Sequence, residues 1–168
     1  MLYTLPSGSR VQIRPIAADD KDKLARGLRQ LSDASIRKRF LAAKPRFTGA
    51  ELRYLTEVDG FNHIALVAVL ADDPDQLVAV ARCVRLPDRP ATAEMAIVVG
   101  DPWQGQGLGR ALATVLADAA LAVGIRRFAA TMLGDNEPAR RLMRTFASRL
   151  QEGHVYGGVR EVLVDLAA

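Results

Sequence analysis

Cysteine, aromatic residues and long apolar runs are all scarce in this sequence. A single cysteine, Cys83, rules out an intramolecular disulfide and fits a reducing compartment. It lies in the apolar run 78–84, which favours a buried thiol over a catalytic nucleophile. Aromatic residues make up 5% of the chain. The core must therefore be mainly aliphatic, and RNA recognition, which usually uses surface aromatics, is not expected.

The missing apolar runs exclude a membrane span, because a spanning helix needs about 20 apolar residues. The N-terminus also lacks a charged start followed by an apolar stretch and a small-residue cleavage site. We therefore predict a cytoplasmic protein with no membrane partner, folded as a single domain over residues 1–168. The two histidines, His63 and His154, have no partners at metal-ligand spacing, so no metal is expected.

Most of the positive charge is carried by arginine, because lysine occurs only at positions 21, 23, 38 and 44. The formal net charge is +4 and the pI is about 9.6. Such a charge favours anionic partners, including nucleic acid, anionic lipid and phosphorylated cofactors, and does not choose among them.

The apolar pattern predicts a mixed α/β fold with a helix between two strands. Strands are expected at 10–16, 63–70, 77–86, 93–99 and 126–132, with one or two more within 153–166. Helices are expected at 19–31, 32–42 and 108–123, with two others starting near Thr48 and Asn136. We expect Asp19 and Asp20 to cap the first of these helices.

A glycine-rich loop at 100–109 connects a strand to the longest predicted helix. Such a loop presents unpaired backbone N–H groups and the positive end of the helix dipole. Its glycines let the backbone approach an anion closely. Arg110, in the first turn of the helix, adds a cation that suits a phosphate. The loop therefore predicts pyrophosphate binding.

Two nucleotide-binding motifs fail at this loop. A dinucleotide fingerprint needs a third glycine where Arg110 stands, and the acidic ribose contact about 20 residues later is missing. A Walker loop needs lysine and then serine or threonine after its last glycine, whereas Gln106 and Gly107 follow Gly105.

The segment Gln104-Gly105-Gln106-Gly107-Leu108-Gly109 resembles the acetyl-CoA motif of GNAT N-acetyltransferases, Gln/Arg-x-x-Gly-x-Gly/Ala. The strand 93–99 and the run Asn136-x-x-Ala-x-x-Leu142 also look like parts of that family. Shorter strings, such as Arg39-Phe40 and 65–69, are similar to the GNAT domain of bacterial Pat-like protein lysine acetyltransferases. The resemblance implies a mixed, mostly antiparallel central sheet, flanked by helices, whose fourth and fifth strands splay apart.

The resemblance also implies how acetyl-CoA is held. The pyrophosphate would lie on the loop, and the pantetheine arm would pair with the fourth strand like an added strand. The implied residues are Ile97, Val98, Val99, Gln104, Gly105, Gln106, Gly107, Leu108, Gly109 and Arg110. The backbone N–H of Val99 is the candidate to polarise the thioester carbonyl. Asn136 either contacts the cofactor, as the matching family residue often does, or is a plain helix N-cap.

Glu94 matches the Ala-Glu that supplies the proposed base of Pat-like enzymes. An acceptor lysine has a pKa of about 10.4 and must lose a proton before it attacks. General-base help is worth roughly 10²–10⁴-fold. The alternative for Glu94 is an exposed strand glutamate without a catalytic role. Thr131 stands where many relatives have a second glutamate, and Met143 stands where they have a tyrosine acid, so no general acid is assigned.

The predicted activity is therefore acetyl transfer from acetyl-CoA to a primary amine. The Pat-like resemblance implies a protein lysine, for example on an acyl-CoA synthetase; a small amine and a non-catalytic acyl-CoA-binding module are the alternatives. Basic residues in the N-terminal helices discourage polycationic amines: Arg26, Arg29, Arg37, Lys38, Arg39, Lys44, Arg46 and Arg53. Arg140, Arg141 and Arg144 form either a solvated basic face, which the sequence favours, or a 3′-phosphate contact. The oligomeric state, monomer or dimer, stays open.

Overall fold

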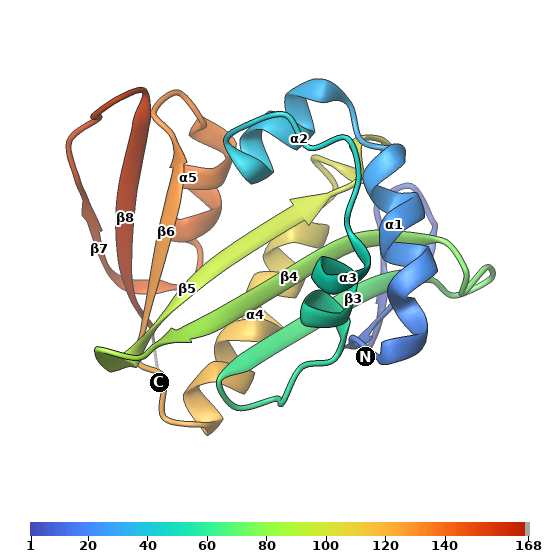
Figure 1. The fold of residues 1–168 in the computed structure, drawn as a ribbon, viewed down its shortest axis with the longest axis horizontal. Coiled ribbons are helices and arrows are strands. Elements are labelled where there is room, and N and C mark those ends of the chain that lie inside the picture. The colour runs from blue at the N-terminus through green and yellow to red at the C-terminus, as the bar shows by residue number, and fades with distance from the viewer. Residues whose placement is uncertain (167–168) are drawn as a thin grey trace.

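The computed structural model describes residues 1–166 and contains one eight-stranded sheet of order β1-β2-β3-β4-β5-β6-β8-β7 (Figure 1). The strands are β1 (Leu2–Thr4), β2 (Arg10–Pro15), β3 (His63–Leu70), β4 (Leu77–Leu86), β5 (Arg89–Val99), β6 (Arg127–Leu133), β7 (Ala147–Glu152) and β8 (Val159–Leu166). All neighbouring strands pair antiparallel except β5 and β6, which are parallel. The predicted mixed, mostly antiparallel sheet is confirmed.

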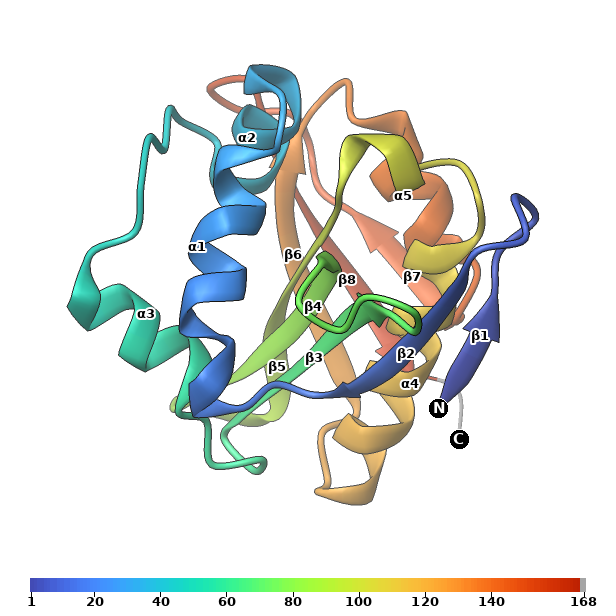
Figure 2. The ribbon, with the colours of Figure 1, turned by 90° about the vertical axis from the view of Figure 1, so that its right-hand side faces the viewer.

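Helices cover both faces of this sheet. On one face lie α1 (Lys21–Arg29), α2 (Asp33–Phe40) and α3 (Gly49–Thr56). On the other face lie α4 (Leu108–Ala122) and α5 (Glu137–Arg144) (Figure 2). The larger core forms under α4, where Leu112 and Leu116 are fully buried against the sheet. A smaller apolar cluster, which includes Leu24 and Val67, lies under α1 and α3.

The sheet opens between β5 and β6. The pairing of β4 with β5 extends to the end of β5, at Ala79 and Val99. The pairing of β5 with β6 covers only Thr92–Glu94 against Arg127–Ala129. Beyond Glu94 the two strands diverge, and Figure 1 shows the open wedge between them. These are the strands that the resemblance counts as fourth and fifth, so the predicted splay is confirmed.

Several predicted boundaries need correction. β3 and β4 have the predicted bounds, but β1 and β7 were not predicted as strands. Asp20 is the N-cap residue of α1, as predicted, but its side chain makes no cap hydrogen bond to that helix, and Asp19 lies in the preceding turn. The Asp20 carboxylate instead accepts hydrogen bonds from Arg14, at 2.7 and 2.8 Å, and from the backbone N–H of Ala17.

Candidate active site

The glycine loop follows β5 directly and opens α4. Gly105 and Gly107 have φ values of 71° and 82°, in the left-handed region that side chains disfavour. Gly107 is the N-cap of α4, and no side chain caps that helix. A Cβ at Gly107 would also lie 3.1 Å from the Tyr3 hydroxyl oxygen. The loop therefore needs glycine at both positions, and no side chain among residues 1–166 accepts from the first-turn N–H groups of α4.

A cavity of about 530 Å³ joins this loop to the wedge in the sheet. It brings together most of the predicted cofactor residues, namely Ile97, Val98, Val99, Gln104, Gly105, Gly107, Gly109, Arg110 and Asn136. Two predicted side chains lie elsewhere. Leu108 is buried in the main core, and the Gln106 amide donates to the Pro102 carbonyl at 3.1 Å. The volume, the loop and Arg110 suit an elongated phosphorylated ligand.

Alternation along β5 decides which of its backbone groups face the wedge. The N–H of Gly100 donates to the Val78 carbonyl on β4, at 2.8 Å. The Val99 carbonyl points away from β4 and accepts from the Gln104 amide, at 3.0 Å. Because backbone direction alternates along an extended strand, Ile97 and Val99 present their N–H groups to the wedge. Val98 presents only its side chain to the cavity.

A polar network that sequence reasoning missed ties α2 to the glycine loop. The Asp101 carboxylate accepts from the hydroxyls of Ser32 and Ser35, at 2.7 and 2.9 Å, and from the Ser32 N–H, at 3.0 Å. The Gln104 amide donates to the Ser35 hydroxyl at 3.0 Å. Burial opposes ionisation of Asp101, but these hydrogen bonds prevail and lower its pKa. Ser32 was recognisable as a helix N-cap, but its partner is 69 residues away in the sequence.

Glu94 lies on β5 at the point where the wedge opens. It lines a second cavity of about 260 Å³ together with Thr131 and Met143, the two positions that depart from the family pattern. Within residues 1–166 the Glu94 carboxylate makes no hydrogen bond and no ion pair. The two cavities share Arg39, Ile97 and Asn136, among others, so they adjoin. A free carboxylate therefore lies next to the cavity predicted for the cofactor.

Asn136 is the N-cap of α5. Its side-chain oxygen accepts from the Ala139 N–H at 3.3 Å, as the N-cap alternative predicted. The residue is also buried and lines both cavities. A cofactor contact through the remaining amide hydrogens stays a prediction.

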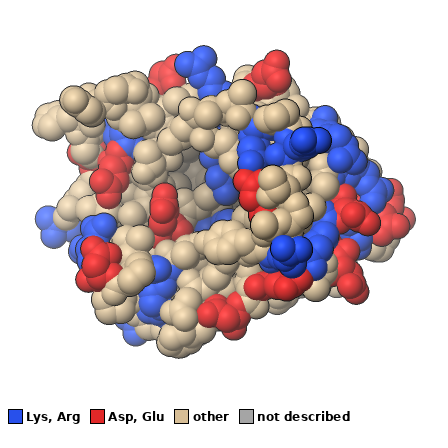
Figure 3. All heavy atoms as spheres, viewed as in Figure 1, with Lys and Arg blue, Asp and Glu red and all other residues tan. Residues whose placement is uncertain are grey.

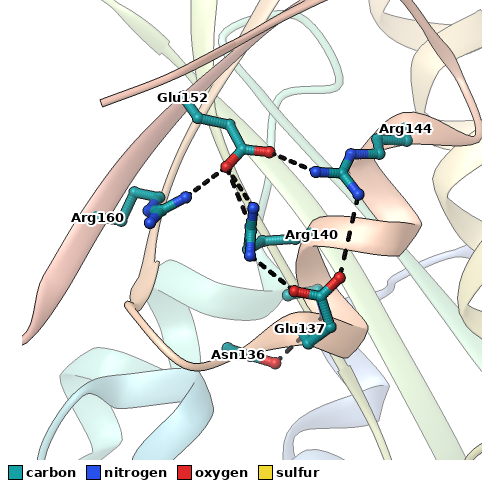
Figure 4. Close-up of polar contacts among 7 residues, drawn as sticks. Asn136, Glu137, Arg140, Arg144, Glu152 and Arg160 are labelled. Atoms are coloured by element: carbon teal, nitrogen blue, oxygen red, sulfur yellow. Dashed lines mark hydrogen bonds and ion pairs between the residues drawn. The ribbon is translucent and has the colours of Figure 1, made fainter. Parts of the chain in front are cut away.

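Arg141 and Arg144 are exposed, as the prediction of a solvated face requires, but Arg140 is half-buried, and two of the three arginines are paired with carboxylates. Arg140 and Arg144 bind Glu152 on β7, at 2.8 and 2.9 Å, and Arg160 on β8 also pairs with Glu152 (Figure 4). Arg140 in addition binds Glu137 at 2.7 Å. Burial opposes ionisation of Glu152, but the arginines prevail and lower its pKa. Arg141 is the member of the three that lines the larger cavity.

The remaining candidate groups have structural roles. Cys83 is buried, as predicted, and burial raises the pKa of its thiol to about 12. Such a thiol is not ionised at neutral pH and is not a nucleophile. Across residues 1–166, no three His, Cys, Asp or Glu side chains gather as a metal site would require. In the same part of the chain, no helix has the length and apolar character needed to cross a membrane.

Comparisons with known proteins agree with this geometry. The sequence matches the Acetyltransferase (GNAT) family over residues 34–147. It is 34% identical over 137 residues to Acetyltransferase Pat of Mycolicibacterium smegmatis, covering 82% of this chain but 40% of that protein. An acetyltransferase of Pseudomonas aeruginosa is 28% identical over 148 residues, covering 88% of this chain and 77% of that protein.

Among solved structures, the GNAT domain of S. lividans PAT is 29% identical, with a TM-score of 0.87. The match covers 99% of this chain and 96% of that domain. The chain thus spans nearly all of an isolated domain but less than half of the M. smegmatis relative.

Proposed function

Since the chain belongs to the GNAT acetyltransferase family, we propose that it acetylates a protein lysine, with Glu94 as the general base. Family membership makes the protein an acyl-CoA-dependent N-acetyltransferase, and acetyl-CoA is its cosubstrate. The lysine acceptor and the role of Glu94 are the parts that need support.

The observation that carries the proposal is the position of Glu94. Its carboxylate is exposed, has no partner in residues 1–166, and borders a cavity that adjoins the one lined by the glycine loop. An unpaired carboxylate can take the proton of an ammonium group, directly or through one water. Thr131 and Met143, which line the same cavity, carry no group that could replace it as a base.

Other residues of this chain bind the cofactor and polarise the thioester carbonyl. The loop glycines and Arg110 hold the pyrophosphate, and the N–H groups of Ile97 and Val99 face the wedge where the pantetheine arm would pair. Val99 is five residues from Glu94 and Ile97 is three, about 17 and 10 Å along a strand. Either N–H can polarise the thioester carbonyl, and Ile97 is the nearer to the base.

In the reaction, the acceptor nitrogen forms a bond to the acyl carbon, the carbon–sulfur bond breaks, and the thiolate leaves. Glu94 accepts one proton from the acceptor ammonium before the attack, and the second proton, which the nitrogen loses as the amide forms, passes to the departed thiolate or to solvent. No general acid is required, because a thiol of pKa about 8.5 leaves without protonation. A lysine of a protein, such as an acyl-CoA synthetase, is favoured over a small amine by the similarity of this sequence to Pat-like lysine acetyltransferases. Basic side chains at the second cavity, Lys38 and Arg39, also disfavour a polycation.

The test is acetyl-CoA-dependent thiol release against a panel of lysine-containing proteins and a panel of small amines. Glu94→Gln should lower kcat by about 10²–10⁴-fold at neutral pH while acetyl-CoA affinity stays the same. Asp88→Asn, in the exposed turn at the far end of β5, is the matched control and should keep full activity. Undiminished turnover of Glu94→Gln would reject the base, and turnover on small amines alone would reject the protein acceptor.

A further inference from the structure

Arg39 lies beside Glu94 and close to a second arginine, Arg82, and neither has a carboxylate partner within residues 1–166. Arg39 extends from α2 and lines both cavities. Burial lowers the pKa of Arg39, and the charge of Glu94 acts in the opposite direction. Within residues 1–166 its guanidinium makes no ion pair and no hydrogen bond, and it lies 4.8 Å from the centroid of the Phe40 ring. The five N–H donors of Arg39 therefore have no acceptor within residues 1–166.

The second arginine, Arg82 on β4, is buried, with 6% of its surface exposed. It donates to the Leu55 carbonyl at 3.1 Å and lies 3.0 Å from His63 Nε2. Burial, and to a smaller extent the positive charge of Arg82, lower the pKa of His63 to about 4. The ring is therefore neutral at pH 7 and can accept a hydrogen bond from Arg82. Arg82 is thus satisfied by neutral acceptors, whereas Arg39 is not.

These groups make the acceptor side of the site electropositive. Burial, and then the charge of Arg39, lower the pKa of Arg82 to about 10, so both guanidinium groups stay charged at neutral pH. The guanidinium groups of Arg39 and Arg82 lie within electrostatic range of each other, and Arg39 and Lys38 line the same cavity as Glu94. Figure 3 views this face and shows a hollow with basic side chains at its edge. An incoming ammonium group would meet more positive than negative charge here, so an anionic group beside it would favour its approach.

We propose that Arg39 is a specificity-determining residue that binds an anionic group next to the acceptor amine. The acceptor is then a lysine with an aspartate or glutamate close to it, whose carboxylate accepts the paired N–H donors of Arg39. This inference rests on the proposed acetyl transfer to lysine and on Glu94 as its base. A phosphate of the cofactor is the less suitable partner for Arg39. Arg110 and Arg141 line the cavity beside the glycine loop and can bind a phosphate there. Arg39 instead lies close enough to Glu94 for that carboxylate to act on its pKa.

The experiment compares three peptides that differ only in the residue next to the lysine, which is glutamate, glutamine or arginine. Each is assayed with the wild-type protein, with Arg39→Gln, and with Arg37→Gln. Arg37 is exposed on the same helix and lines neither cavity, so it controls for the loss of one positive charge. Melting temperature and acetyl-CoA affinity are measured for every variant, because Arg39 also borders the cofactor cavity.

The wild type should favour the glutamate peptide over the glutamine peptide by about tenfold or more in kcat/KM. Arg39→Gln should abolish that preference and keep its acetyl-CoA affinity, and Arg37→Gln should retain the preference. Equal rates on all three peptides in the wild type, or an unchanged preference in Arg39→Gln, would overturn the role of Arg39 and leave the proposed function intact.

A second pair of acceptors keeps the test decisive if peptides are not acetylated. Lysine and 1,5-diaminopentane differ only by a carboxylate next to one amine. If only small amines react, the protein acceptor fails, and a wild-type preference for lysine that Arg39→Gln loses would still support the anion site. Transfer to none of these acceptors would overturn both proposals.

Discussion

The two sides of the wedge are stabilised by different forces. On one side, β3, β4 and β5 pair over long registers, and α4 covers them with fully buried aliphatic side chains such as Leu112 and Leu116. On the other side, α5 is tied to β7 and β8 by ion pairs centred on Glu152 (Figure 4). Only the short pairing of Thr92–Glu94 with Arg127–Ala129 joins β5 to β6.

This difference explains how one sheet can contain a site. The apolar side holds β5 rigid, so its free N–H groups keep a fixed position. The charged side positions the N-terminus of α5, with Asn136, across the wedge. Backbone groups that would normally pair with β6 stay available for a ligand, which can then add as a strand.

The largest stability effect should follow from opening a cavity on the apolar side. Leu116 is fully buried between α4 and the sheet. Leu116→Ala should reduce the free energy of unfolding by about 2–5 kcal/mol, since it removes buried methyl groups and leaves a cavity. Urea denaturation at low and high salt measures it. The loss should be the same at both ionic strengths, and a salt-dependent loss would contradict an apolar origin.

A smaller effect is expected from a substitution in the glycine loop, and it should appear in the affinity for acetyl-CoA rather than in the stability of the fold. Gly107→Ala forces a side chain into a left-handed conformation, at about 1–2 kcal/mol, beside the Tyr3 hydroxyl. We expect acetyl-CoA affinity to fall about tenfold, because the loop must shift. Isothermal titration measures it.

The other end of α4 supplies the matched control. Gly124 has a similar φ of 85°, and a Cβ there would meet no atom within 4 Å. Gly124→Ala should therefore cause the same backbone strain and leave the affinity for acetyl-CoA unchanged. Equal losses of affinity in the two variants would show that general destabilisation, rather than the loop, causes the effect.

The features that could be predicted from sequence depend on residues close together in the chain. β3 and β4 are mainly apolar runs, interrupted in β4 by Arg82 and Arg85, and α4 has a regular apolar face, so their bounds follow from local patterns. The glycine loop was recognisable because its left-handed backbone positions favour glycine whatever the distant contacts of the loop are. β7 was missed because most of its side chains are exposed or half-buried and no apolar alternation marks them.

The features that could not be predicted depend on contacts between distant segments. The pairing of Arg140 and Arg144 was missed because their partner, Glu152, is the last residue of β7, a strand that was itself missed. The meeting of Arg39 with Arg82 requires α2 to fold over β4 and β5, and no local pattern encodes that approach. Asp101 likewise meets Ser32 and Ser35 only in the folded chain.

The smallest effect should come from the charged side. Glu152→Gln leaves Arg160 without its recorded carboxylate and leaves Arg140 and Arg144 with only Glu137. Because the pairs are partly exposed, the loss of stability should be below about 1 kcal/mol and should shrink as salt rises. Hydrogen exchange of α5 and β7 amides measures it locally, and exchange should quicken there and not in α4.

The pH dependence of stability distinguishes the ion pairs centred on Glu152 from the apolar core under α4. The folded-state pKa of Glu152 is lowered, so its stabilisation is present above the unfolded value of about 4.3 and is lost as pH falls through the folded value. Between about pH 4 and 7 the wild type should hold α5 more firmly than Glu152→Gln, and the two should converge in stronger acid. Leu116→Ala should stay below the wild type at every pH. If Glu152→Gln behaved in that way too, packing rather than charge would hold α5 against the sheet, and the contrast between the two sides of the wedge would disappear.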